Sequence, residues 1–127
     1  MKLRILDNSI RLRLTRTEVE TLAAEGLVRG RTHFAGRNSF AYVLESSPAT
    51  VQPEAHFSNN VLTVRAPKLD IHNWVNSDKV SIRSEQLLDD GENLRILIEK
   101  DFACLAPREG EDDSDMYPHP NAESDSC

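Results

Sequence analysis

Residues 2–14, with the sequence KLRILDNSIRLRL, alternate apolar and basic side chains. This period of two is typical of a half-buried β-strand, whose successive side chains point to opposite faces. Asp7-Asn8 interrupts the alternation, and both residue types favour turns, so we expect a hairpin with a two-residue loop. A continuous strand with a bulge at the same two residues would also gather the basic side chains on one face. The expected cross-strand pairs of the hairpin are Ile5 with Ile10, Arg4 with Arg11, Leu3 with Leu12 and Lys2 with Arg13.

The next pattern is that of a short amphipathic helix. Thr15 and Glu18 have the spacing of a capping box, in which each side chain covers a free backbone N–H of the first turn. Apolar residues then recur at helical spacing, and Gly26 provides the left-handed residue on which many helices end. We therefore predict a helix over residues 16–25. A second helix is predicted over residues 68–76, after a proline that suits the first helical turn.

Short segments bounded by turn-forming residues predict the remaining strands, over residues 27–34, 39–45, 54–58, 61–66, 79–85 and 94–102. Hairpin-length connections dominate, whereas parallel βαβ units would need regular alternation of strands and helices. We therefore expect an α+β fold with about eight strands, and so many strands in one small sheet must curl. The predicted architecture is a strongly curled antiparallel sheet or a partly closed β-barrel with two short helices. No internal repeat is evident.

Composition divides the chain into a body and a tail. Residues 1–102 have the size of a single domain, whereas residues 103–127 are rich in Asp, Glu, Ser and Pro and are expected to form a flexible acidic tail. Residues 101–127 hold one Lys or Arg against eight Asp or Glu, so most of the net charge of −6 comes from the tail. A body close to neutral disfavours nucleic acid as a partner.

The expected location is the cytoplasm. No stretch approaches the roughly 18 apolar residues of a membrane span, and no apolar segment follows the basic start of the chain. The two cysteines, Cys104 and Cys127, fit neither a disulfide framework nor a lipidation motif. We therefore expect a soluble protein with reduced thiols and no membrane contact.

The candidate functional residues are the cations that point outward from the predicted strands. Guanidinium groups bind phosphate and carboxylate oxygens in a fork of hydrogen bonds, and like charges that face each other across a strand pair destabilise it. The sequence therefore predicts an anion site, with Arg95, Glu85 and Glu99 on the same surface. The plainer interpretation, and the commoner one, is the solvated side of a half-buried sheet. The candidate ligand-binding residues are Lys2, Arg4, Arg11, Arg13, Arg65 and Arg83.

No arrangement of residues predicts catalysis, a metal or a cofactor. The histidines, His33, His56, His72 and His119, have no recognised ligand spacing with one another or with the cysteines. Cys104 follows a predicted strand and is expected to be a small buried apolar residue. The sequence has no nucleophile elbow and no phosphate-binding glycine loop. An enzyme is therefore the less favoured interpretation.

The two ends of the chain resemble a family of short, uncharacterised bacterial proteins. The shared features are the segment NSIRLRL at residues 8–14 and the segment EKDFACL at residues 99–105, with an acidic, proline-containing tail at residues 109–120. This resemblance covers nearly the whole chain and implies no activity or site residues. In architecture alone, a barrel with charged inner walls would be similar to the CYTH superfamily, which binds triphosphates with divalent metal. That superfamily opens with an ExExK strand, whereas KLRI stands at residues 2–5, so the resemblance implies neither the metal nor hydrolysis.

Two functions fit these features. The first is a small cytoplasmic binding module whose basic strand face takes an anionic ligand, such as a phosphorylated small molecule. The second is a non-catalytic interaction or regulatory protein whose acidic tail binds its own basic face or a protein partner. The acidic residues available for this are Glu109, Glu111, Asp112, Asp113 and Asp115.

Overall fold

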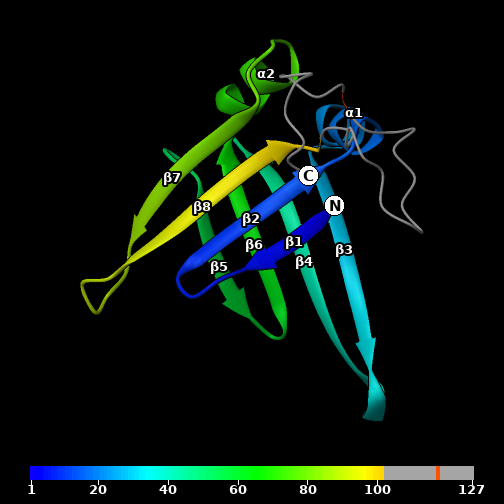
Figure 1. The fold of residues 1–127 in the computed structure, drawn as a ribbon, viewed down its shortest axis with the longest axis vertical. Helices are drawn as coiled ribbons and strands as arrows, with labels where there is room; N and C mark the ends of the chain where they lie inside the picture. Colours follow the sequence, from blue (N-terminus) through cyan, green and yellow to red (C-terminus); the bar gives the residue numbers. More distant parts are fainter. Residues whose placement is uncertain (102–116, 118–127) are drawn as a thin grey trace, which may run out of the picture.

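The computed structural model describes residues 1–101 and Tyr117. Eight strands and two helices follow one another in this part of the chain (Figure 1). The strands are β1 (Lys2–Ile5), β2 (Ser9–Leu14), β3 (Leu27–Phe34), β4 (Asn38–Ser47), β5 (Glu54–Ser58), β6 (Val61–Pro67), β7 (Ser81–Leu87) and β8 (Asn93–Lys100). The helices are α1 (Arg16–Glu25) and α2 (Lys68–Val75), and a single 3-10 turn, η1 (Ala35–Arg37), connects β3 to β4.

The strands form two four-stranded sheets. The first sheet has the order β1-β2-β8-β7, and the second has the order β3-β4-β6-β5. In each sheet the outer pairs are antiparallel, and the central pair, β2 with β8 or β4 with β6, is parallel. Figure 1 shows the sheets face to face with their strands running in different directions, and both helices at one end of the molecule. Each helix carries the chain from one sheet to the other.

This topology corrects the predicted architecture in two respects. The α+β class and the eight strands are confirmed, but the described strands form two open sheets instead of one curled sheet or a barrel. Purely antiparallel pairing is also wrong, because each central pair joins strands from different hairpins in parallel. Parallel strands need a crossover of a dozen or more residues, and here other strands and helices of the chain provide it. The hairpin-length connections between consecutive elements therefore do not reveal the parallel pairs.

Local signals located most elements correctly. The hairpin of β1 and β2 has the predicted register, and Asp7 adopts a positive φ of 49°, which aspartate tolerates in tight turns. Helix α1 covers the predicted residues: the Thr15 N–H donates to Glu18 Oε1 over 3.0 Å, and Gly26 ends the helix at φ 80°. Helix α2 begins directly after Pro67, which is its N-cap. Several strands begin or end a residue or two away from their predicted bounds.

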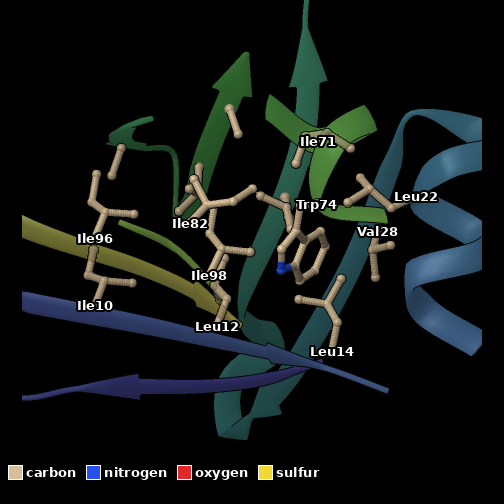
Figure 2. Packing of buried hydrophobic residues seen from close by; sticks show 14 of the residues in the cluster. Ile10, Leu12, Leu14, Leu22, Val28, Ile71, Trp74, Ile82, Ile96 and Ile98 are labelled. Atoms are coloured by element: carbon tan, nitrogen blue, oxygen red, sulfur yellow. The ribbon is translucent and has the colours of Figure 1, made fainter. Parts of the chain in front are cut away.

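The core lies between the two sheets and beneath the helices. Alternate residues of each strand point inward, and Leu12, Leu14 and Ile98 are completely buried. Trp74 of α2 is also completely buried, and Figure 2 shows it among residues of both sheets. Its indole N–H donates to the Val80 carbonyl over 2.9 Å, so the polar atom of this large side chain is paired.

The two halves of the chain repeat one unit, which corrects the expectation of no internal repeat. Elements β1, β2, α1, β3 and β4 correspond in order to β5, β6, α2, β7 and β8. Replacing each element by its counterpart turns the strand order of the first sheet into that of the second. Matched positions often share only a side-chain class: Leu22 of α1 corresponds to Trp74 of α2, and both are buried. The repeat is therefore hidden in the sequence.

Candidate anion-binding face

The outer face of the first sheet carries the candidate site. Ile10, Leu12 and Leu14 of β2 are buried, so Arg11 and Arg13 between them point away from the core. The same alternation turns the basic residues of β1 and β7, and Arg95 of β8, outward. We call this surface the basic face. Its cations are Lys2, Arg4, Arg11, Arg13, Arg83 and Arg95, and its carboxylates are Glu85 and Glu99.

Five of the six predicted ligand-binding residues lie on the basic face, and Arg65 does not. Arg65 belongs to β6 in the second sheet, where its Nε donates to Glu45 Oε2 over 3.2 Å. Alternation places Arg65 correctly on an outer face, but the expected single surface is wrong because the strands divide between two sheets. Arg95, which we expected on the same surface without assigning it to the site, does lie there.

The strand register arranges the basic face in three rows that cross the sheet. The first row contains Lys2, Arg13, Glu99 and Ser81. The second row contains Arg4, Arg11, Leu97 and Arg83. The third row contains Ser9, Arg95 and Glu85. Of these three rows, the second alone contains no carboxylate.

Glu99 neutralises much of the first row. Its Oε1 accepts a hydrogen bond from Arg13 Nε over 2.5 Å and lies 3.6 Å from Arg11 Nε. The side chains of Glu99, Arg13 and Arg11 are 16%, 31% and 34% exposed, so water screens these ion pairs less than it would on an open surface. One carboxylate therefore serves two arginines, and Arg11 has the longer and weaker contact.

The second row is the least compensated part of the face. Within the described part of the chain, neither Arg4 nor Arg83 has an ion pair. Arg4 lies directly opposite Arg11, an arrangement that costs a few tenths to about 1 kcal/mol. A hollow of about 340 Å³ lies beside Arg4 and Arg11, and a second of about 530 Å³ lies beside Arg11, Arg83 and Arg95. Arg11 thus borders both hollows.

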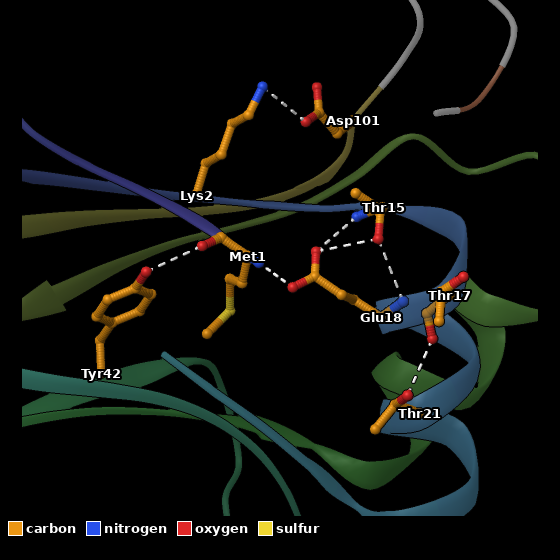
Figure 3. Close-up of polar contacts among 8 residues, drawn as sticks. All are labelled: Met1, Lys2, Thr15, Thr17, Glu18, Thr21, Tyr42 and Asp101. Carbon is orange, nitrogen blue, oxygen red and sulfur yellow. Dashed lines mark hydrogen bonds and ion pairs between the residues drawn. The ribbon is translucent and has the colours of Figure 1, made fainter. Parts of the chain in front are cut away.

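Buried charges lie at the end of the first sheet near α1 (Figure 3). Lys2 Nζ is 3.2 Å from Asp101 Oδ2, but this buried oxygen has no hydrogen-bond donor within the described structure. The Met1 ammonium group pairs with Glu18, and the Tyr42 hydroxyl donates to the Met1 carbonyl over 3.1 Å. Burial lowers the pKa of this ammonium group, and the charge of Asp101 opposes the shift. Lys2 is therefore engaged by a carboxylate of its own chain.

Lys100 ends β8 on its inner side and is not part of the basic face. Its Nζ donates to the Ser77 carbonyl over 2.8 Å and lies 5.7 Å from the ring centre of Trp74 and 5.4 Å from that of Tyr117. Burial lowers the pKa of Lys100, and the charge of Asp78 opposes this shift. This cation is therefore held by a carbonyl and two aromatic rings inside the protein.

Tyr117 is the one residue beyond 101 that the structure describes, and it packs against the body. Its N–H donates to the Asp101 carbonyl over 2.9 Å, and the Arg16 guanidinium lies 5.4 Å from its ring centre. The rest of the predicted acidic tail, residues 103–116 and 118–127, lies outside the described residues. Docking of that tail on the basic face stays a prediction.

Residues 1–101 and Tyr117 contain neither a cluster of metal ligands nor a membrane-spanning helix. No three His, Cys, Asp or Glu side chains in this part gather closely enough to hold a metal ion. No helix in it is both long and apolar enough to span a membrane. Cys104, which we expected to be a small buried apolar residue, and His119 lie outside these residues.

Comparison with known proteins places the chain in a family. The model of a family of unknown function (DUF7009) matches residues 1–121. The chain belongs to the DUF7009 family. No curated protein and no solved structure matches this DUF7009 protein. The expected membership of an uncharacterised family is confirmed, whereas neither the similarity to the CYTH superfamily nor the terminal motifs chosen as family marks find support. The function of the DUF7009 protein is therefore argued from its basic face.

Proposed function

We propose that this protein is a small binding module that takes an anionic, phosphorylated ligand on its basic face. The observation that carries the proposal is the second row, which contains Arg4, Arg11 and Arg83 and no carboxylate of its own, so that, among the described residues, Arg11 has only its long contact with Glu99 of the first row. Folding gains nothing from placing Arg4 opposite Arg11. A phosphate between these guanidinium groups would accept charge-assisted hydrogen bonds from both, which are about twice as strong as neutral ones.

The shape of the face favours a ligand with two phosphoryl groups. The hollows lie on the surface of a sheet, so a single phosphate would remain largely in water and bind weakly. A ligand with two phosphoryl groups could place one in each hollow, with Arg11 in contact with both. Nucleic acid fits less well, because the basic face has no aromatic side chain on which a base could stack.

Binding is favoured over catalysis by the chemistry of the groups present. Arginine stays protonated in proteins, so the five arginines of the basic face cannot act as general acids or bases, and Lys2 is paired with Asp101. Of the two carboxylates, Glu99 is bound to Arg13, and Glu85 lies 4.0 Å from Arg95. The face is thus equipped to hold an anion and not to move a proton.

Thermal unfolding with inorganic pyrophosphate tests the proposal. At ten times its dissociation constant, a ligand that binds only the folded state adds about 1.4 kcal/mol of stability. For a chain of this length, this raises Tm by roughly 4–7 °C. Sodium chloride at the same ionic strength separates specific binding from screening, and it should leave Tm almost unchanged.

Two variants of equal charge locate the site. The first changes Arg4, Arg11 and Arg83 of the basic face to Gln and should abolish the rise in Tm with pyrophosphate. The second makes the same change on the outer face of the second sheet and should keep the rise. Equal behaviour of the two variants would contradict the proposal. The residues changed in the second variant are Arg29, Arg31 and Arg65.

The alternative function has one observation in its favour. Tyr117 is bonded to Asp101, whose carboxylate lies beside Lys2, so the acidic tail is tied to the body near the basic face. In this alternative the carboxylates of the acidic tail are the anions that bind the basic face or a protein partner. A synthetic peptide of residues 108–120 should then bind the full-length protein less tightly than it binds a variant whose tail carboxylates are changed to amides. Equal affinities would rule out docking on its own face.

A further inference from the structure

The internal repeat gives each position on the basic face a counterpart on the outer face of the second sheet. The strand register fixes these counterparts. Arg4 lies opposite Arg11 in the hairpin of β1 and β2, and His56 lies opposite Thr63 at the same place in the hairpin of β5 and β6. The second sheet therefore shows which side chains this fold accepts at each position when no anion site is required.

Equivalent backbone hydrogen bonds support this match. The Arg95 N–H donates to the Asn8 carbonyl over 2.9 Å, which ties β8 to the end of the first hairpin. The Ala41 N–H donates to the Asn60 carbonyl over 3.0 Å, which ties β4 to the end of the corresponding hairpin. Arg95 and Ala41 thus occupy the same place in the two halves.

The ion pair at the centre of each sheet is common to both sheets. Arg13 and Glu99 are partners in the parallel pair of the first sheet, and Arg65 and Glu45 hold the same places in the second. Because both sheets have this pair, it belongs to the shared scaffold and joins the two central strands. Arg83 also has an arginine as its counterpart.

Three cations of the basic face have counterparts without a permanent charge. Arg4 corresponds to His56, Arg11 to Thr63 and Arg95 to Ala41. In addition, Lys2 corresponds to Glu54 and Glu85 corresponds to Arg31. The second sheet's outer face therefore carries three arginines against two glutamates, whereas the basic face carries six cations against two glutamates. The fold therefore tolerates uncharged residues at these places, and it does not itself account for the three arginines.

We propose that the anion site is an addition to one of the two sheets of a duplicated fold, and that Arg4, Arg11 and Arg95 are the residues that distinguish it. This inference rests on the proposed function. Arg13 joins β2 to β8 through its ion pair with Glu99 and contributes to the anion site only indirectly. Lys2 forms an ion pair with Asp101. The corresponding face of the second sheet binds no such ligand, so the protein takes one ligand and not two.

Exchanging residues between the two halves tests this assignment. The loss variant carries Arg4→His, Arg11→Thr and Arg95→Ala, so each position receives the residue that the other half already accommodates. The single variant Arg11→Thr serves if the triple variant does not fold, which circular dichroism shows. Pyrophosphate binding is measured by calorimetry on the full chain. One ligand per chain is expected for the parent, about tenfold weaker binding for Arg11→Thr, and no measurable binding for the triple variant.

The gain variant makes the reverse exchange and carries Ala41→Arg, His56→Arg and Thr63→Arg. Its stoichiometry should rise from one ligand to two, and an unchanged stoichiometry of one would contradict the assignment. If the parent protein binds no pyrophosphate, both the proposed function and this inference are wrong. A folded loss variant of equal affinity would contradict both, because the proposed function also places Arg4 and Arg11 in the site. A parent that binds two pyrophosphates per chain would overturn this inference alone, because both outer faces would then take the ligand.

Discussion

Glu99 is the carboxylate that two arginines of the basic face share, and its removal gives a quantitative prediction. Its carboxylate is 16% exposed and contacts both Arg13, at 2.5 Å, and Arg11, at 3.6 Å. Changing Glu99 to Gln keeps the size of the side chain and removes its charge. The change therefore isolates the electrostatic part of the interaction from the packing of β8 against β2.

The expected loss of stability follows from the contacts. Weakening the partly buried bond from Arg13 costs about 1–2 kcal/mol. Arg4 then faces Arg11, and Lys2 faces Arg13, without the shared carboxylate, and each like-charged pair costs a few tenths to about 1 kcal/mol. We expect Glu99→Gln to lower the free energy of unfolding by about 2–3 kcal/mol at low salt.

The repeat supplies the matched control. Glu45 holds the same place in the second sheet, but it is 40% exposed and, among the residues that the structure describes, forms an ion pair with Arg65 alone, so Glu45→Gln should cost only about 0.5 kcal/mol. Urea unfolding of both variants measures the difference, which should shrink in 1 M salt. Pyrophosphate should stabilise Glu99→Gln more than the parent, because it replaces the missing anion. Equal costs for the two variants would refute the reasoning.

Two further predictions concern the body of the protein. A Cβ at Gly30 would lie 2.3 Å from the Tyr42 ring, so Gly30→Ala should lower the free energy of unfolding by about 1–3 kcal/mol, and an unchanged urea midpoint would show that the ring moves freely. Burial lowers the pKa of Lys100 in the folded state, so the unfolded chain holds this proton more strongly and stability rises with pH just below the ordinary lysine value. Lys100→Met should remove that part of the rise, as seen in urea unfolding at pH 8 to 10, and a parallel pH dependence of the two proteins would contradict the assignment.

The features that could be predicted from the sequence are those whose cause is local. The β1–β2 register follows from alternation and from a turn at Asp7-Asn8. The ends of α1 follow from Thr15, Glu18 and Gly26, because capping acts within one turn of the chain. These features depend on residues that are neighbours in the sequence.

The pairing of distant strands could not be predicted in the same way. Alternation shows that Arg65 points outward, but it does not show to which sheet β6 belongs. The repeat is equally hidden, since core positions such as Leu12 and its counterpart Val64 share only apolar character. For the same reason, the distinction between the scaffold cation Arg13 and the proposed ligand-binding cation Arg11 appears only when the two sheets are compared.

The central claim is that an anion binds the basic face, and arginine side-chain NMR tests it most directly. The Nε–Hε signals of the full-length protein are recorded as pyrophosphate is added at constant ionic strength. We predict saturable shifts for Arg4, Arg11 and Arg95, with little change for Arg29 and Arg65 on the second sheet. Small shifts of similar size on both sheets, or none that saturate, would contradict it.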